Sequence, residues 1–126
     1  MSNCIFCKIV KGDLPCYKVW EDEKYLAFLD INPASKGHTL LIPKNHYQWV
    51  YDVPNFGEYW EKALFVTKKI QKALKPKYIS YFTHGVLVPH AHIHIIPRYD
   101  TFETLPKSKQ VSKEELEKVL NELNKS

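Results

Sequence analysis

A run of seven residues, 90–96, constrains the fold more than any other part of the chain. It reads His-Ala-His-Ile-His-Ile-Ile and is bounded by Pro89 and Pro97. Because successive side chains of a β-strand point to opposite faces, this alternation separates the histidines from most of the apolar residues. The run therefore predicts a strand with one face packed on a core and the other face polar.

The polar face would carry His90, His92 and His94, with about 6.6 Å between successive members. Histidine is a rare residue, so three in strict alternation argue against a solvated face that carries them by chance. One metal ion fits all three poorly, because the outer pair would lie about 13 Å apart and zinc–nitrogen bonds measure about 2 Å. The spacing favours divided roles, and the middle residue, His92, suits nucleophilic attack on a phosphorus atom.

Other apolar, β-rich runs predict the remaining strands, at residues 19–20, 25–29, 38–43 and 78–83. A polar turn separates the first two runs, and a loop dense in turn residues, 32–37, precedes the third. With the histidine run, these segments predict a sheet of about five strands.

Two amphipathic helices are expected. Between about 55 and 75 apolar residues recur at three- and four-residue spacing, and Asn55 with Glu58 resembles a capping box. A second capping box, Ser112 with Glu115, opens a C-terminal helix with its large apolar residues on one side. Since strands and helices do not alternate regularly, the sequence predicts the α+β class with a mainly antiparallel sheet.

The length of 126 residues predicts one domain, 1–101, followed by a connector and helix, 102–126, that belongs to the same domain or forms a dimer contact. The net charge of +4 suits an anionic ligand. The lysine-rich stretches 68–77 and 107–125 are interpreted as solvated helix faces, so no nucleic-acid partner is expected. A signal-peptide pattern and a long apolar segment are both missing, which predicts a cytoplasmic protein without a membrane partner.

Two of the three cysteines are spaced Cys4-x-x-Cys7. In a reducing compartment this spacing favours metal or redox chemistry over a structural disulfide. The pair is half of a tetrahedral zinc site, which needs two further ligands. The alternative is a free cysteine pair, and Cys16 is expected to be a small, at least half-buried residue.

Four stretches in this order resemble the histidine-triad (HIT) family of nucleotide hydrolases and transferases, and they span roughly residues 4–100. They are residues 4–10, 27–33, 37–46 and 88–98. The resemblance implies a HIT-like fold that forms a homodimer and binds a purine nucleotide such as AMP or an adenosine phosphoramidate. It implies cleavage of phosphoramidate or dinucleoside polyphosphate-type bonds, with release of a nucleoside monophosphate.

The resemblance also implies a role for each site residue. His92 is the nucleophile that forms a transient nucleotidyl-histidine, and His94 and His38 contact the phosphate. Asp30 accepts from the ribose hydroxyls. The apolar slot for the base consists of Phe6, Phe28 and Ile31, of which the last two could equally be core residues.

A structural zinc is implied by the same resemblance. Its ligands are Cys4, Cys7, His46 and His90. A set of four protein ligands is closed, so His90, the first histidine of the triad, is assigned to the metal and His92 stays free for chemistry.

One loop departs from the family pattern. Gly85 stands where a family glycine would, but Val86 and Leu87 follow it, without the usual polar side chains. His84 or Thr83 could replace these groups, and the alternative for His84 is an exposed turn histidine. The departure favours a second interpretation, a nucleotide-binding or sensing dimer with weak or no catalysis. A third, removal of adenylate from nucleic-acid ends, would imply a longer basic surface and a further zinc-finger domain.

Overall fold

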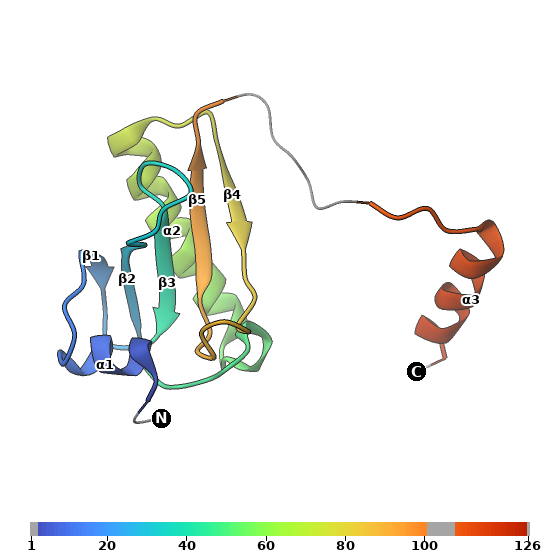
Figure 1. The fold of residues 1–126 in the computed structure, drawn as a ribbon, viewed down its shortest axis with the longest axis horizontal. Helices are drawn as coiled ribbons and strands as arrows, with labels where there is room; N and C mark the ends of the chain where they lie inside the picture. Colours follow the sequence, from blue (N-terminus) through green and yellow to red (C-terminus); the bar gives the residue numbers. More distant parts are fainter. Residues whose placement is uncertain (1–2, 101–107, 126) are drawn as a thin grey trace.

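An antiparallel sheet of five strands carries the fold in the computed structural model, which describes residues 3–100 and 108–125 (Figure 1). The strands lie in the order β1-β2-β3-β5-β4, so β1 and β4 form the two edges. Their bounds are β1 Lys18–Glu21, β2 Tyr25–Leu29, β3 Thr39–Pro43, β4 Tyr78–Phe82 and β5 Ile93–Arg98. The predicted α+β class and sheet are confirmed.

The central strand β3 is buried on both faces of the sheet. On one face Leu41 packs in a core with Ile93 and Ile95 of β5 and the inner side of helix α2, Phe56–Leu74. On the other face Leu40 and Ile42 pack in a second, smaller core. Helix α2 confirms the predicted long helix. Because it covers one face of the sheet, a site would lie on the opposite face.

The start of α2 differs from the predicted capping box. Asn55 has a left-handed backbone (φ 56°, ψ 51°), and its side chain makes no capping hydrogen bond. A side-chain N-cap normally has extended backbone, so the left-handed conformation places this amide out of reach. A short 3-10 helix, η1 at Val50–Asp52, precedes this turn.

Helix α1, Ile5–Lys11, was not predicted. It begins at Cys4, whose Sγ accepts from the Cys7 N–H at 3.4 Å, and ends at Gly12 with φ 87°. Its buried residue, Phe6, belongs to the second core. The two cysteines are thus held at the first turn of a helix above that core.

The histidine run is only partly a strand. β5 begins at Ile93, so the prediction that His90, His92 and His94 share one strand face is wrong. The backbone N–H of Ala91 instead donates to the carbonyl of Tyr47, which lies outside the sheet. Only His94 is a strand residue, paired with Leu40 of β3 on the face opposite α2.

The C-terminal helix α3, Lys113–Leu123, stands apart from the sheet in Figure 1. The Ser112 side chain accepts from the Glu115 N–H, which confirms this predicted cap. Every residue of α3 is exposed. None of the helices in residues 3–100 and 108–125 is long and apolar enough to cross a membrane.

The first core provides a stability test. Tyr59 is fully buried, and its hydroxyl donates to the Leu41 carbonyl at 2.7 Å. Because Tyr59→Phe removes this hydrogen bond, we expect the free energy of unfolding in urea to fall by about 1 kcal/mol. Tyr51 is 71% exposed, so the matched variant Tyr51→Phe should change it by less than about 0.5 kcal/mol. Equal effects of the two variants would contradict the assignment.

Candidate active site

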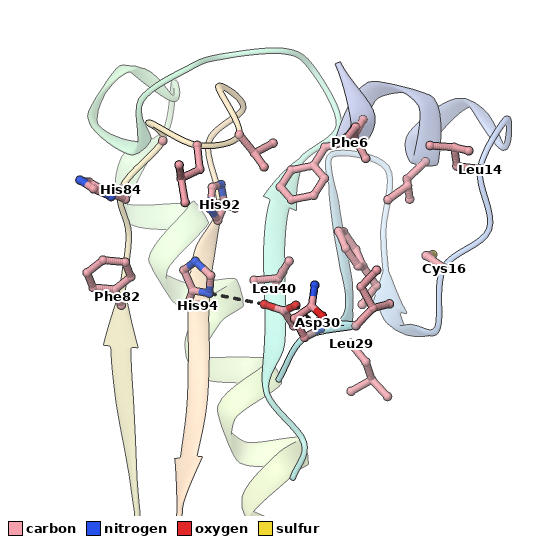
Figure 2. Close-up of a pocket in the computed structure, with 18 of the residues that line it drawn as sticks. Phe6, Leu14, Cys16, Leu29, Asp30, Leu40, Phe82, His84, His92 and His94 are labelled. Carbon is pink, nitrogen blue, oxygen red and sulfur yellow. Dashed lines mark hydrogen bonds and ion pairs between the residues drawn. The ribbon is translucent and has the colours of Figure 1, made fainter. Parts of the chain in front are cut away.

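A cavity of about 560 Å³ opens on the face of the sheet opposite α2 (Figure 2). Helix α1 and strand β2 form one side of the cavity, and β4 with the loop after it forms the other side. His94 of β5 lies between the two sides. The predicted residues that line it are Phe6, Phe28, Asp30, Ile31, Gly85, His92 and His94. Two predicted residues, His38 and His90, do not line the cavity and are buried behind it.

Several lining residues were not predicted. Leu40 and Phe82 line the cavity because they are the cross-strand partners of His94 on β3 and β4. The pairing register of β5 with β3 and β4 would have identified Leu40 and Phe82. Leu14 and Cys16 come from the segment after α1, and Cys16 is half-buried as expected.

The Nε2 ring nitrogen of His92 has no hydrogen-bond partner among residues 3–100 and 108–125. Nδ1 of the same ring lies 2.7 Å from the carbonyl oxygen of His90, which only accepts, so Nδ1 carries the proton. In the neutral ring Nε2 then holds a lone pair. Burial lowers the pKa of His92, which favours this neutral form, and Phe6 packs edge-on against the ring at 5.3 Å. The arrangement places an unprotonated ring nitrogen on the cavity wall, which is what a nucleophile or a base needs.

His38 fixes the tautomer of His94. The Ala34 N–H donates to Nδ1 of His38 at 2.9 Å, so the proton of His38 is on Nε2. This Nε2 lies 2.9 Å from Nδ1 of His94 and donates to it. His94 therefore carries its own proton on Nε2, where it can serve as a hydrogen-bond donor. His38 positions His94 from behind.

Asp30 lies beside this pair. Its Oδ2 is 4.0 Å from Nδ1 of His94 (Figure 2). The same oxygen is 3.5 Å from Nε2 of His38, and Oδ1 accepts from the Asn32 N–H. Burial is the main cause that lowers the pKa of His38 and of His94. The pKa of His94 falls to about 4. Both rings are therefore neutral near pH 7, and the contact with Asp30 is polar rather than an ion pair.

The four predicted metal ligands come together in a separate cluster. Cys4, Cys7, His46 and His90 place their ligand atoms within 4.8 Å of one another. Nδ1 of His90 lies 3.3 Å from Sγ of Cys4 and 3.6 Å from Sγ of Cys7, and Nδ1 of His46 lies 3.2 Å from the latter. This set of two thiols and two imidazoles fits a tetrahedral metal ion.

The second ring nitrogen of His90 supports the same interpretation. Nε2 lies 2.8 Å from the Pro43 carbonyl and donates to it, which leaves the lone pair on Nδ1, toward the sulfurs. Metal-binding histidines commonly make such a bond with their other ring nitrogen. Asp30, His38 and His94 are also mutually close, but Nε2 of His38 already carries a proton, so this group fits a metal poorly.

The loop before the histidines depends on a glycine at position 85 and on a side-chain hydrogen bond from Thr83. Gly85 has φ 82°, and a Cβ there would lie 2.7 Å from the Gln48 carbonyl oxygen, so a glycine is required. The Thr83 hydroxyl donates to the His92 carbonyl at 2.7 Å and anchors the loop. Leu87 lines the cavity and is 93% exposed, so it leaves this part of the mouth apolar, whereas Val86 is 55% exposed and does not line the cavity.

The lowered pKa of His94 predicts a pH-dependent stability. The ordinary pKa is 6.5 and the folded value about 4, so the unfolded chain binds the proton more readily. This contribution is present above pH 6.5 and is lost as the pH falls toward 4. Between pH 7 and 5 it amounts to roughly 1–2 kcal/mol. Urea unfolding at both pH values should show a smaller loss in His94→Asn than in the unmodified chain, and equal losses would contradict it.

Comparisons with known proteins agree with this geometry. Residues 11–101 match the family model described as HIT domain. An uncharacterized HIT-like protein of Methanocaldococcus jannaschii is 41% identical over 126 residues, 95% of this chain and 98% of that protein. The adenosine 5'-monophosphoramidase of Schizosaccharomyces pombe is 44% identical over 101 residues, 76% of this chain and 74% of that protein.

A solved structure matches as well. The crystal structure of a HIT-family member from Bacillus subtilis aligns with a TM-score of 0.85 at 37% identity, over 98% of this chain and 96% of that one. The sequence matches and the shared fold therefore lead to one conclusion: the chain belongs to the HIT family.

Proposed function

We propose that the protein hydrolyses or transfers a nucleotidyl group through a covalent intermediate on His92. The observation that carries this proposal is the free Nε2 of His92 at a cavity, with its Nδ1 proton held by the His90 carbonyl. The Schizosaccharomyces pombe relative, named adenosine 5'-monophosphoramidase, supports a purine nucleotide with a phosphoramidate bond as the substrate.

The nucleotide would bind with its base between α1 and β2. Phe6 and Phe28 contact each other edge-on at 5.5 Å and form an apolar wall, and Ile31 at the rim is 78% exposed and free to cover a base. The carboxylate of Asp30 would accept from the ribose hydroxyls. The Nε2 proton of His94 would then face the α-phosphate, with His38 behind it.

In the first step the Nε2 lone pair of His92 forms a bond to the α-phosphorus, and the bond from phosphorus to the leaving group breaks. The leaving group departs with the electron pair of that bond and takes up a proton from solvent. The ring becomes positively charged, and the carbonyl of His90 stabilises this charge through the Nδ1 proton. His94 donates to the phosphate oxygens. Water then attacks phosphorus and the bond from phosphorus to Nε2 breaks. The electron pair returns to Nε2, a proton of the water passes to solvent, and the nucleoside monophosphate is released.

Zinc would be held by Cys4, Cys7, His46 and His90 as a structural ion with no open position for substrate. It would fix α1 and the segment before η1 against His90, and so set the position of His92 two residues on. Because the cysteines must stay reduced to bind it, the proposal includes a cytoplasmic location.

The apolar loop supports a second candidate, a nucleotide-sensing protein with little catalysis. Val86 and Leu87 offer no side-chain donor to a leaving group, and the Thr83 hydroxyl is already bonded to the His92 carbonyl. His84 is the nearby polar side chain that lines the cavity. Turnover of a substrate distinguishes this candidate from the enzyme.

The nucleophile is tested with a fluorogenic adenosine phosphoramidate. We expect His92→Ala to lower kcat by at least about 1,000-fold, because no other group replaces Nε2. Calorimetry should show that the variant still binds AMP, which serves as the control for folding. If the unmodified chain and the variant are equally inactive and both bind AMP, the enzyme is excluded and the sensing protein stands. If neither binds AMP, both proposals fail.

The metal is tested by elemental analysis of protein purified without chelator. We expect about one zinc per chain, and we expect removal with a strong chelator to lower Tm, because folding and metal binding are coupled. Cys7→Ser should lose the zinc, whereas Cys16→Ser, outside the cluster, should retain it. Less than about 0.2 zinc per chain with an unchanged Tm would exclude the structural zinc.

A further inference from the structure

The cavity continues past the two histidines that would face the α-phosphate. If the base and ribose take the side of α1 and β2, the group on the far side of the phosphate has the side of β4, which we call the leaving-group side. Its described residues are Phe82, His84, Gly85, Leu87 and Val88. Figure 2 shows Phe82 and His84 across His92 and His94 from Phe6. Because the attacking and leaving atoms lie roughly in line at phosphorus, the leaving group points away from His92, toward the mouth of the cavity.

The leaving-group side is apolar where it meets solvent. Phe82 is 52% exposed, and its ring lies 5.5 Å from that of His94 between centroids, so it stands beside the proposed phosphate donor. Leu87 is 93% exposed at the mouth, and Val88 is half-buried and packs on the second core. A single exposed leucine is ordinary on a protein surface. An apolar wall continuous with a cavity is instead typical of a ligand pocket.

The polar groups of this loop are turned to the protein. The Thr83 hydroxyl donates to the His92 carbonyl at 2.7 Å, and the Gly85 carbonyl accepts from Nε2 of Gln48 at 3.3 Å. Among the described residues of the leaving-group side, His84 alone has a polar side chain, and its ring packs on that of Phe82 at 5.7 Å. A leaving group therefore meets mainly carbon.

Charge in the cavity also limits the leaving group. No lysine or arginine within residues 3–100 and 108–125 lines the cavity. Burial lowers the pKa of His92 and of His94, which favours their neutral forms near pH 7. A polyphosphate leaving group carries several negative charges, which cationic side chains usually neutralise in the transition state. An amine leaves without net charge and does not need them.

We propose that the cavity selects a nucleoside phosphoramidate whose amine carries an apolar substituent, and that Leu87 is the specificity-determining residue. The substituent packs on Leu87, Phe82 and Val88 while the phosphorus–nitrogen bond breaks. The amine departs with the electron pair of that bond and takes up a proton from solvent. This inference rests on the proposed function for the bond that is cleaved, but the packing of the substituent does not depend on turnover.

A homologous series of adenosine 5'-phosphoramidates of n-alkyl amines, from ethyl to hexyl, tests the apolar wall. The amines have nearly equal basicity, so the intrinsic reactivity of the phosphorus–nitrogen bond stays constant and differences in kcat/KM report packing. Since complete burial of one methylene group is worth about fourfold, we expect kcat/KM to rise at least about tenfold from the ethyl to the hexyl compound. Diadenosine tetraphosphate should be cleaved at least about 100-fold less efficiently than the hexyl compound.

Two serine variants assign the effect to one side chain. Leu87→Ser removes the apolar contact and should lower the hexyl-to-ethyl ratio of kcat/KM to about threefold or less. Val86→Ser is the matched control, because Val86 is the adjacent exposed loop residue and does not line the cavity, so the ratio should stay as in the unmodified chain. Equal ratios in the two variants would contradict the role of Leu87. Urea unfolding midpoints check that both variants fold.

Binding separates this inference from the proposed reaction. In the His92→Ala variant, calorimetry should give a dissociation constant at least about tenfold lower for the hexyl than for the ethyl compound. If the unmodified chain hydrolyses the series with a ratio near one, or prefers diadenosine tetraphosphate, the inference is overturned and the hydrolase stands. If nothing is hydrolysed but the difference in binding persists, the hydrolase fails and the apolar leaving-group side stands. Loss of both overturns both.

Discussion

Two hydrogen bonds from imidazole rings to backbone carbonyls determine what the site can do. His92 donates to the carbonyl of His90, and His90 donates to that of Pro43. A neutral imidazole that donates from one nitrogen presents a lone pair on the other. The same constraint therefore directs one lone pair toward the cavity and another toward the sulfurs of Cys4 and Cys7. If residues 90–92 continued β5, these carbonyls would bond to a neighbouring strand instead.

The sequence predicted the sheet well because its strands follow local patterns. Alternation placed Ile93 and Ile95 on the core face, and helical spacing predicted α2 nearly to its ends. The start of β5 was wrong because it depends on a non-local bond, from Ala91 to Tyr47, that no periodicity reveals. Helix α1 was missed because it is short and is capped by Cys4, a residue outside the usual N-cap set.

The site itself was predicted mostly from family motifs. The motifs assigned Phe6, Asp30 and His94 to one site and four residues to one metal cluster. The structure places each of these sets together. The motifs did not reveal that His38 acts from behind His94, or that Leu40 and Phe82 flank it. Those facts depend on strand register and on the tautomer of each ring, both of which require the three-dimensional contacts.

Phe6 lies between the two cysteines in the chain, and its ring touches both His90 and His92, at 5.8 and 5.3 Å. The cysteine pair and the wall of the cavity thus share one turn of helix. Any ion that immobilises this turn would remove part of the ordering entropy that a nucleotide otherwise has to overcome. Thermodynamic linkage is reciprocal, so a bound nucleotide would tighten the hold on the ion by the same factor. Occupancy of the two sites would then rise and fall together.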